Sequence, residues 1–285
     1  MNTLKVILLG TKGGPRIMKG VAKPTCSLLE SGDEFCVIDC GLGVSIALVN
    51  AGYALDKLKT IFITHHHSDH TIELGPLLHT AWNSGLKHEV TVYGPAGTKE
   101  LLHNFYQSQI LDITIRVEDE KLRDIRDMVK VIEYHGGEFA SFAGMQVSAM
   151  RNRHPPVKDS FALKFEGGGK KIVFSGDTCY MKEMADFAAG ADLLIHEAMD
   201  REGMTKICER MKNTKPNLME HMLAAHTFTE QVGEIASAAK VKKVVLNHLI
   251  PPIGDLVGKE SFESALESTW TGKYAVAEDG HTEII

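Results

Sequence analysis

The sequence has few cysteines, and none of them lie in a paired motif. There are five, scattered along the chain, and no two are separated by only two residues. A disulfide framework uses an even number of cysteines, and a thiolate zinc site usually contains CxxC pairs. The pattern argues against both, so we expect free thiols in a reducing, cytoplasmic setting.

Long hydrophobic runs and an excess of basic charge are also missing. No apolar stretch approaches the roughly 18 residues of a membrane span, and the first ten residues are too short an apolar run for a signal peptide. Lys and Arg number 31 against 37 Asp and Glu, a formal net charge of −6. Nucleic-acid-binding proteins usually have a basic face. We therefore expect no membrane partner and no nucleic-acid partner.

What the sequence does contain is an alternation of two patterns. Short apolar runs bounded by Gly, Asp or Asn, such as residues 6–9 and 60–63, predict strands. Between them, segments such as 98–106 and 230–239 have helical periodicity. This alternation predicts an α/β fold in which helices flank two sheets.

We expect a single domain, residues 1–285, because no linker or repeat interrupts the pattern. One segment, at about 200–223, departs from the alternation and carries four methionines among five basic residues. It predicts a helical excursion. A surface helix pair with a methionine-filled inner face is the simpler interpretation. A lid, a substrate wall or a dimer contact is the alternative.

Four side chains that can bind metal lie directly after the predicted strand at 60–63. They are His65, His67, Asp69 and His70, and His66 between them is expected to point away. Imidazoles two residues apart at a strand end can converge on one ion, which leaves the next carboxylate and imidazole for a neighbouring ion. Packing rarely requires such a concentration, so the run predicts two adjacent metal sites.

One short loop cannot complete two coordination spheres, so other strand ends must supply ligands. His154 precedes two prolines that stiffen its loop. Asp177 lies in a Ser-Gly-Asp-Thr turn, and His248 follows the apolar run at 244–246. Each alone is compatible with an ordinary loop residue, but together the three form a candidate ligand set.

The ordered series of an HxHxDH run, a later histidine, an aspartate in SGDT and a final histidine resembles the metallo-β-lactamase superfamily over nearly the whole chain. The resemblance implies a four-layer αβ/βα sandwich, the metallo-β-lactamase fold. It also implies a ligand assignment. One metal would be bound by His65, His67 and His154, the other by Asp69, His70 and His248, with Asp177 bridging them.

The implied ligands are nitrogen and oxygen atoms only, a set that suits two Zn²⁺ ions and leaves Mn²⁺ or Fe as alternatives. Two such ions about 3.5–4 Å apart can share a water and lower its pKa toward about 7. We therefore expect a hydrolase whose nucleophile is a metal-bridging hydroxide. Asp69 is expected both to bind metal and to orient or deprotonate that hydroxide.

Two histidines outside the ligand set are catalytic candidates, because a leaving alkoxide needs a proton. His226, in an Ala-His-Thr motif, is the better candidate, and a cap for the following helix is its alternative. His196, in a His-Glu-Ala motif, is equally compatible with the site and with the core.

The HEA and HT motifs resemble the ribonuclease Z-like branch, whereas GTKGGP and LNHLIP resemble the metallo-β-lactamase-fold arylsulfatases. Ribonuclease Z enzymes commonly carry a tRNA-gripping arm between the third-ligand histidine and the bridging aspartate, but here residues 155–176 allow only a compact hairpin. The resemblance to the arylsulfatases therefore implies hydrolysis of a small-molecule ester, with a homodimer as the family-level expectation.

Alternative functions stay open. They are a phosphodiesterase or ribonuclease Z-type endonuclease, a lactone or carboxylic ester hydrolase, and a catalytically weak metal-binding protein. Three residues are candidate substrate contacts: Lys12 in the glycine-rich segment 10–15, Thr178 after the bridging aspartate, and Trp82 at the start of a rim loop. A tight turn at the exit of the first strand is the alternative role of the glycine-rich segment.

Overall fold

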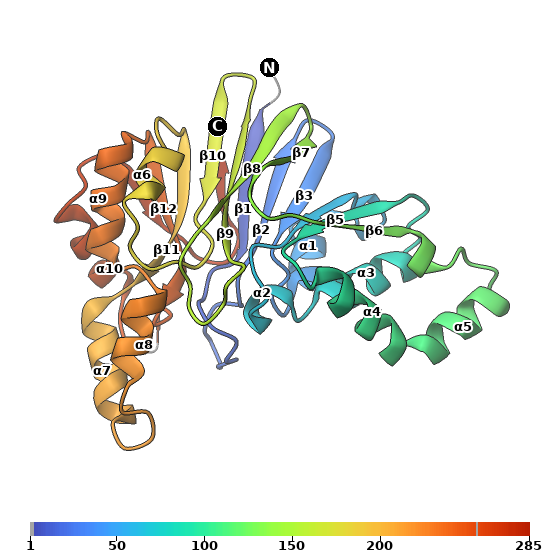
Figure 1. Cartoon of the computed structure of the whole chain (residues 1–285), viewed down its shortest axis with the longest axis horizontal. Helices are drawn as coiled ribbons and strands as arrows, with labels where there is room; N and C mark the ends of the chain where they lie inside the picture. Colours follow the sequence, from blue (N-terminus) through green and yellow to red (C-terminus); the bar gives the residue numbers. More distant parts are fainter. Residues whose placement is uncertain (1–2, 255) are drawn as a thin grey trace.

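The computed structural model describes residues 3–254 and 256–285. Two seven-stranded sheets pack face to face, and helices cover the outer side of each (Figure 1). The expected four-layer αβ/βα sandwich is therefore confirmed. Among the described residues, none of the helices has both the length and the apolar character that crossing a membrane requires.

The first sheet is built mainly from the amino-terminal half of the chain, with the last strand at its edge. In spatial order it contains β14 (His281–Ile284), β1 (Leu4–Gly10), β2 (Cys26–Ser31), β3 (Glu34–Ile38), β4 (Thr60–Phe62), β5 (Val90–Gly94) and β6 (Val129–Glu133). Strands β3 to β6 are parallel. Their carboxyl ends therefore meet at one edge of the sheet.

The second sheet comes from the carboxy-terminal half. Its spatial order is β13 (Lys273–Val276), β12 (Lys243–Ile250), β11 (Leu193–Met199), β10 (Lys170–Phe174), β9 (Phe161–Gly167), β8 (Met145–Arg151) and β7 (Gly137–Phe142). Strands β10 to β13 are parallel. Since β9 runs antiparallel to both β8 and β10, β8 also ends at the same edge as β10.

Each outer face is closed by helices with an apolar side toward its sheet. The first sheet is covered by α1 (Val44–Asn50), α3 (Leu74–Asn83), α4 (Thr98–Ser108) and α5 (Ile110–Glu118), and α2 (Ser68–Thr71) is a short turn before α3. The second is covered by α6 (Glu183–Phe187), α9 (Thr229–Ala239) and α10 (Lys259–Glu267). Two 3₁₀ turns, η1 (Leu55–Lys57) and η2 (Ile125–Asp127), complete the first half.

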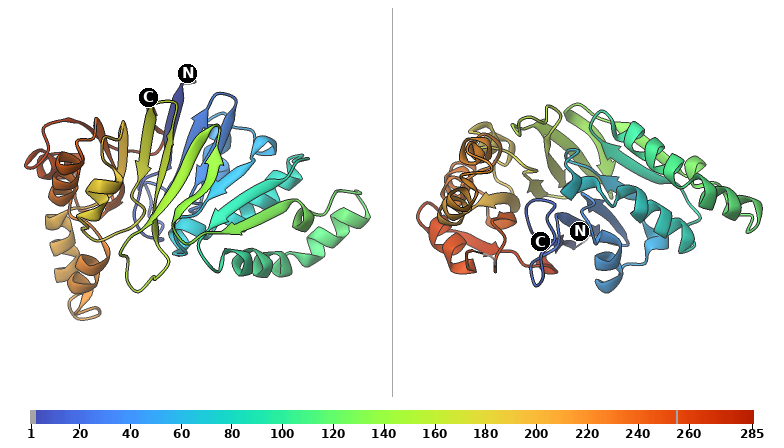
Figure 2. Two further views of the ribbon diagram at one scale, coloured as in Figure 1. Left: turned by 45° about the horizontal axis from the view of Figure 1, so that its top comes forward. Right: turned by 90° about the horizontal axis from the view of Figure 1, so that it is seen from below.

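The segment at about 200–223 forms α7 (Arg201–Met211) and α8 (Leu218–Ala225). These two helices make a hairpin that projects away from the sandwich (Figures 1 and 2). A small apolar cluster at its base includes Met199, Met204 and Phe228. The methionines on the inner side of the hairpin pack there, and the outer side is exposed.

Sequence reasoning predicted the central strands and did not predict β2, β6, β7, β13 and β14. Strand β7 is mostly exposed or half-buried, and β13 and β14 have only four residues each. Such strands lack the strong apolar alternation on which a sequence-based strand prediction depends. Their pairing is decided by the neighbouring strand instead.

The core between the sheets is aromatic where it approaches the loop after β4. Phe62, the last residue of β4, is fully buried. Its ring stacks on Tyr93 at a centroid distance of 5.0 Å and meets the edge of Phe165 at 5.2 Å. Phe62 joins one sheet to the other, and the histidine run begins three residues later.

Replacing Phe62 by Ala should lower the free energy of unfolding by about 3–5 kcal/mol, because a buried aromatic ring is removed from between two sheets. Urea unfolding of the metal-loaded protein measures this change. Ile46→Ala is the matched control, since Ile46 is 69% exposed on α1 and its loss should cost less than about 0.5 kcal/mol. Equal losses in the two variants would contradict the role of Phe62.

Candidate metal centre

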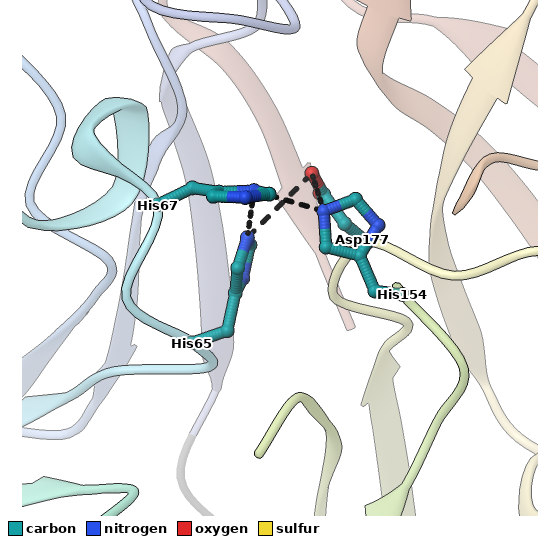
Figure 3. A group of neighbouring side chains, drawn as sticks. All are labelled: His65, His67, His154 and Asp177. Atoms are coloured by element: carbon teal, nitrogen blue, oxygen red, sulfur yellow. Dashed lines mark hydrogen bonds and ion pairs between the residues drawn. The ribbon is translucent and has the colours of Figure 1, made fainter. Parts of the chain in front are cut away.

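Four side chains from both halves of the chain converge at the carboxyl edge of the two sheets (Figure 3). His65 and His67 follow β4, His154 follows β8, and Asp177 follows β10. His67 Nδ1 lies 3.2 Å from His65 Nε2 and 2.9 Å from His154 Nε2. Asp177 Oδ2 lies 3.8 Å from His65 Nε2 and 3.7 Å from His154 Nε2.

A second group adjoins the first and shares Asp177 with it. His248 Nε2 lies 3.3 Å from Asp69 Oδ2 and 3.1 Å from Asp177 Oδ2. His70 Nε2 lies 3.4 Å from Asp177 Oδ1 and 3.7 Å from Asp69 Oδ2. Oδ2 of Asp177 thus faces histidines of both groups and Oδ1 faces His70, so this carboxylate lies between the two groups, where one that bridges two ions would lie.

The chemistry of these side chains fits divalent metal ions. Three ring nitrogens of the first group point at one another at close range, and a cation between them is the arrangement that satisfies all their lone pairs. In the second group His70 Nε2 is buried, and within the described residues it has no hydrogen-bond partner. A metal ligand is expected to leave such an atom unpaired until the ion is bound.

Protonation equilibria support this fit for the first group. Burial lowers the pKa of His65 well below its usual value, and burial lowers the pKa of His154 to about 4. Burial also lowers the pKa of His67. Neutral imidazoles are the form that binds metal, so these three histidines are ready to bind an ion without first losing a proton.

The second group lies in a strongly negative environment. Burial opposes the charged form of Asp177, but the facing imidazoles of His248 and His70 outweigh it and hold the pKa of this carboxyl well below its usual range. Burial likewise opposes protonation of His70, yet the carboxylates of Asp177, Asp39 and Asp69 raise its pKa well above the ordinary value. A position surrounded by three carboxylates favours a cation.

Asp39 was not predicted, although it supports the site directly. It follows β3 and has a φ of +61°. Its Oδ2 accepts hydrogen bonds from His70 Nδ1 at 2.8 Å and from Thr64 Oγ1 at 2.9 Å, and its Oδ1 accepts from the Thr64 amide at 2.8 Å. Asp39 therefore sets the orientation of one ligand and the start of the histidine run. An aspartate followed by Cys-Gly at a strand end was the available signal.

His248 is aimed at the site by a β-bulge. Strand β12 pairs Asn247 with Glu197 and Leu249 with Ala198, so His248 is the extra residue. Its φ is +46°, a left-handed conformation that a bulge can impose. The loop after β1 covers it closely, because a Cβ on Gly13 would lie 2.9 Å from the imidazole. Glycine at position 13 permits this contact.

His226 lies beside the two groups and is held by a carboxylate that sequence reasoning missed. Its Nδ1 donates to Glu197, at 3.1 Å from each carboxylate oxygen. Burial lowers the pKa of His226, but the charge of Glu197 and the hydrogen bond to it outweigh burial and raise the pKa overall. The His-Glu-Ala motif was the available signal for Glu197.

Beside the ligands is a pocket of about 280 Å³. His226 lines it together with His67, Asp69, Asp177 and His248, and Met222 of α8 and the loop segment 13–15 close its sides. A phosphate or sulfate ester can therefore reach the ligands and His226 at the same time.

His196 is separated from the ligands by strand geometry. Alternate residues of a strand point to opposite faces, and Ile195 belongs to the core between the sheets while Glu197 reaches the site. His196 therefore faces the helix layer, where it is fully buried and its Nδ1 donates to the Glu197 carbonyl at 2.7 Å.

The three candidate substrate contacts do not line the pocket. Lys12 is 1% exposed, and its ammonium donates to the carbonyl of Gly14, whose amide in turn donates to Asp69 Oδ2 at 2.8 Å. Thr178 is fully buried, and its amide donates to Glu197 Oε1 at 2.8 Å. Trp82, on α3, is buried in the core of the first half, and its indole nitrogen donates to the Arg123 carbonyl at 2.9 Å. Lys12 and Thr178 thus support site residues, and Trp82 is remote.

Comparison with known proteins gives relatives that match along most of the chain. A family model described as Anti-Pycsar protein Apyc1 matches residues 5–248. Ribonuclease Z of Mycobacterium bovis (strain BCG / Pasteur 1173P2) is 28% identical over 282 residues, covering 98% of this chain and 97% of the relative. Ribonuclease Z of Mycobacterium sp. (strain KMS) is 30% identical over 252 residues, covering 88% and 85%.

Solved structures give the same fold. The metallo-β-lactamase fold protein YhfI from Bacillus subtilis has a TM-score of 0.73 and 21% identity, covering 99% of this chain and 100% of that one. Human tRNase Z, short form, has a TM-score of 0.69 and 21% identity, and the match covers 98% of each chain. Zn²⁺-bound PqqB from Methylobacterium extorquens has a TM-score of 0.71 and 14% identity, and the match covers 98% of this chain and 99% of that one. The expected metallo-β-lactamase fold and ribonuclease Z-like likeness are confirmed.

The expectation of a small-molecule ester substrate and no nucleic-acid partner is wrong. Relatives named for RNA cleavage match nearly the full length of the chain, and none of the proteins compared above is an arylsulfatase. That expectation rested on the resemblance of GTKGGP and LNHLIP to the arylsulfatases, on the missing arm and on the net charge of −6. A whole-chain charge averages over segments of opposite sign and says nothing about where the positive ones lie.

Asp39→Asn should weaken metal binding by about 10–100-fold, because the amide no longer provides a charged acceptor for His70. Competition with a chromogenic zinc chelator measures the affinity, and metal analysis of the wild-type protein should give about two ions per chain. Asp33→Asn is the control, since Asp33 lies in an exposed turn between β2 and β3. An affinity that Asp39→Asn leaves unchanged would disprove the supporting role of Asp39.

Proposed function

The chain belongs to the family described as Anti-Pycsar protein Apyc1, and from this premise and its ribonuclease Z relatives we propose that it is a two-metal phosphodiesterase that cleaves RNA. One observation carries the proposal. Asp177, which the two histidine groups share, lies beside His226. His226 bonds to Glu197 through Nδ1 and lines the same pocket as Asp177, so its Nε2 can act on a substrate there. This combination suits displacement at phosphorus with a leaving group that needs a proton.

The ligand residues divide the work of binding the metals. His65, His67 and His154 would hold one ion, Asp69, His70 and His248 would hold the other, and Asp177 would contact both. Two divalent ions held in this way would supply Lewis acidity toward the phosphate and a water of lowered pKa. Zinc is the proposed metal, supported by the nitrogen-rich ligands and by a Zn²⁺-bound structural neighbour.

The free state of all five cysteines supports a reducing, cytoplasmic location.

Asp69 is positioned to hold the attacking water. Its Oδ2 accepts the Gly14 amide at 2.8 Å and faces His248 Nε2 at 3.3 Å. The buried ammonium of Lys12 donates a hydrogen bond to the Gly14 carbonyl. This bond restrains Gly14, and with it the amide that Asp69 accepts. Both contacts to Asp69 are made by Oδ2, which leaves Oδ1 to accept the proton of a water.

His226 is the proposed general acid. Donation from Nδ1 to Glu197 orients the ring and stabilises its protonated form, so the proton to be delivered is the one on Nε2. Glu197 acts through His226 and is a positioning residue. The Thr178 amide also donates to Glu197 Oε1, which holds the Glu197 carboxylate in its position beside the imidazole.

This oriented acid favours a phosphodiester of RNA over an aryl sulfate. The ribose oxygen that leaves during RNA cleavage is a poor leaving group, whereas an aryl oxide leaves with little help from a proton donor. A histidine held by a buried carboxylate is therefore of most use to the first substrate. The ribonuclease Z relatives support the same choice.

The substrate class is tested by a panel of bis-p-nitrophenyl phosphate, a precursor tRNA and p-nitrophenyl sulfate. The zinc-loaded protein should hydrolyse both phosphodiesters, and Asp177→Asn should reduce both activities below about 1% because both metals lose a ligand. Asp186→Asn, on the outer helix α6, should leave them unchanged. Faster turnover of the sulfate than of either phosphodiester would refute the proposal.

His226→Ala should slow cleavage of precursor tRNA by about 10²–10⁴-fold, the usual contribution of a general acid. The same variant should slow bis-p-nitrophenyl phosphate by less than about tenfold, because p-nitrophenolate leaves without protonation. Glu197→Gln should show the same split to a smaller degree.

The control for this pair is His221→Ala, since His221 is exposed on α8. Metal content is measured alongside, so that a lost ion is not mistaken for a lost acid. Equal losses on the two substrates in metal-replete His226→Ala would eliminate the acid role.

A further inference from the structure

The helical hairpin α7–α8 is anchored at the metal centre. The carbonyl of Ala225, the last residue of α8, accepts a hydrogen bond from His154 Nδ1 at 2.8 Å. The next residue is His226, and Met222 lines the pocket. The base of the hairpin is therefore held by a proposed metal ligand on one side and by the proposed acid on the other.

The far end of the hairpin is positively charged, whereas the protein as a whole carries a net negative charge. Its tip, residues 210–215, contains Arg210, Lys212 and Lys215 and no acidic residue, and all three side chains are exposed. The basic residues nearer the base are neutralised. Arg201 pairs with Glu230 at 2.5 Å and Lys206 with Glu202 at 2.6 Å.

The tip charges, by contrast, have no such partners. Throughout the described part of the chain, no carboxylate lies within ion-pair distance of the three tip cations. Over the whole hairpin, residues 201–225, five basic residues stand against the three acids Glu202, Glu209 and Glu220, which gives a net charge of +2. In a chain of net charge −6 this local excess is a specific feature.

A second basic segment lies across the pocket from the hairpin. The loop after β1 contributes Gly13, Gly14 and Pro15 to the pocket lining and continues into the exposed residues Arg16 and Lys19. In Figure 1 this loop and the hairpin both extend from the same side of the sandwich. Positive charge thus flanks the metal centre on two sides.

We propose that the hairpin tip, Arg210, Lys212 and Lys215, binds the phosphate backbone of an RNA substrate whose scissile bond lies at the metal centre, with Arg16 and Lys19 contacting the other flank. This inference rests on the proposed function and adds a recognition surface to it. The eight residues of α8 span about 12 Å. At roughly 3.4 Å per stacked nucleotide, the tip contacts phosphates about three or four nucleotides from the cleaved bond.

In this proposal the hairpin supplies the RNA contacts that an arm between His154 and Asp177 would otherwise make. Residues 155–176 include all of β9 and β10, which belong to the second sheet. A chain that cleaves RNA needs backbone contacts beyond the reacting phosphate, because phosphate contacts set the register of the substrate. In the described part of this protein, α7–α8 is a projecting element that carries such cations.

The test is the triple variant Arg210→Gln, Lys212→Gln, Lys215→Gln in the zinc-loaded full chain. KM for precursor tRNA should rise about tenfold or more at moderate salt, and kcat should change little. The slope of log affinity against log salt concentration should fall by about two, since each lost phosphate contact removes about 0.7–0.9. Hydrolysis of bis-p-nitrophenyl phosphate should stay within twofold of wild type.

The matched control is Lys87→Gln, Lys130→Gln, Lys273→Gln. These exposed lysines lie at or just before the amino ends of β5, β6 and β13, which run parallel to β4 or β12, so they are at the edge opposite the metal centre. The control removes the same charge from the same protein. It should leave KM and the salt slope for precursor tRNA unchanged.

The outcomes separate this inference from the proposed function. If wild type cleaves precursor tRNA and the tip variant matches the control, the tip does not bind RNA. If the variant loses both substrates, or changes only its oligomeric state, the hairpin serves the pocket or a protein contact instead. If wild type hydrolyses bis-p-nitrophenyl phosphate but not RNA, the RNA substrate itself is refuted and this inference with it.

Discussion

The structure depends above all on the burial of one carboxylate, Asp177, between two sheets. A buried carboxylate is costly unless opposite charge and hydrogen bonds surround it. Asp177 follows β10 of the second sheet and is faced by His248 of the same sheet at 3.1 Å and by His70, which follows β4 of the first sheet, at 3.4 Å. The charge is therefore fully balanced only when the two sheets are packed against each other, which couples formation of the site to closure of the sandwich.

The ligands that balance this charge are each oriented by a partner from elsewhere in the chain. Asp39 holds His70, Ala225 holds His154, and the Gly14 amide holds Asp69. Each contact joins two segments that lie at least 31 residues apart in the sequence. Such support is needed because metal geometry tolerates only small displacements, and an imidazole on a loop would otherwise rotate freely. The rim of the sandwich is thus rigid where the chemistry occurs, and the projecting hairpin starts from this rigid rim.

Sequence alone gave the ligand run because its information is local: the HxHxDH spacing after an apolar strand is enough to indicate two adjacent metal sites. The supporting residues were not predicted, since their roles depend on proximity across the chain. Asp39 acts on His70 from 31 residues away, and Glu197 acts on His226 from 29 residues away. Lys12 and Trp82 were predicted to contact substrate, but both side chains are buried. Their residue types suit either role, and only the tertiary packing decides which residue is buried. His196 could have been separated from Glu197 by strand alternation alone.

The choice between sulfate and phosphate could not follow from the metal ligands, for a physical reason. A phosphodiester and a sulfate monoester both present a tetrahedral monoanion, so two cations and a bridging carboxylate attract them about equally. Discrimination must come from groups that act away from the central atom. In the proposed roles, His226 would distinguish leaving groups by their need for a proton, and the cations on the hairpin would distinguish substrates by the charges that follow along a chain. The cations lie at the tip of the α7–α8 hairpin and His226 directly follows α8, so one short segment contains the residues proposed to separate a nuclease from a small-ester hydrolase with the same metal ligands.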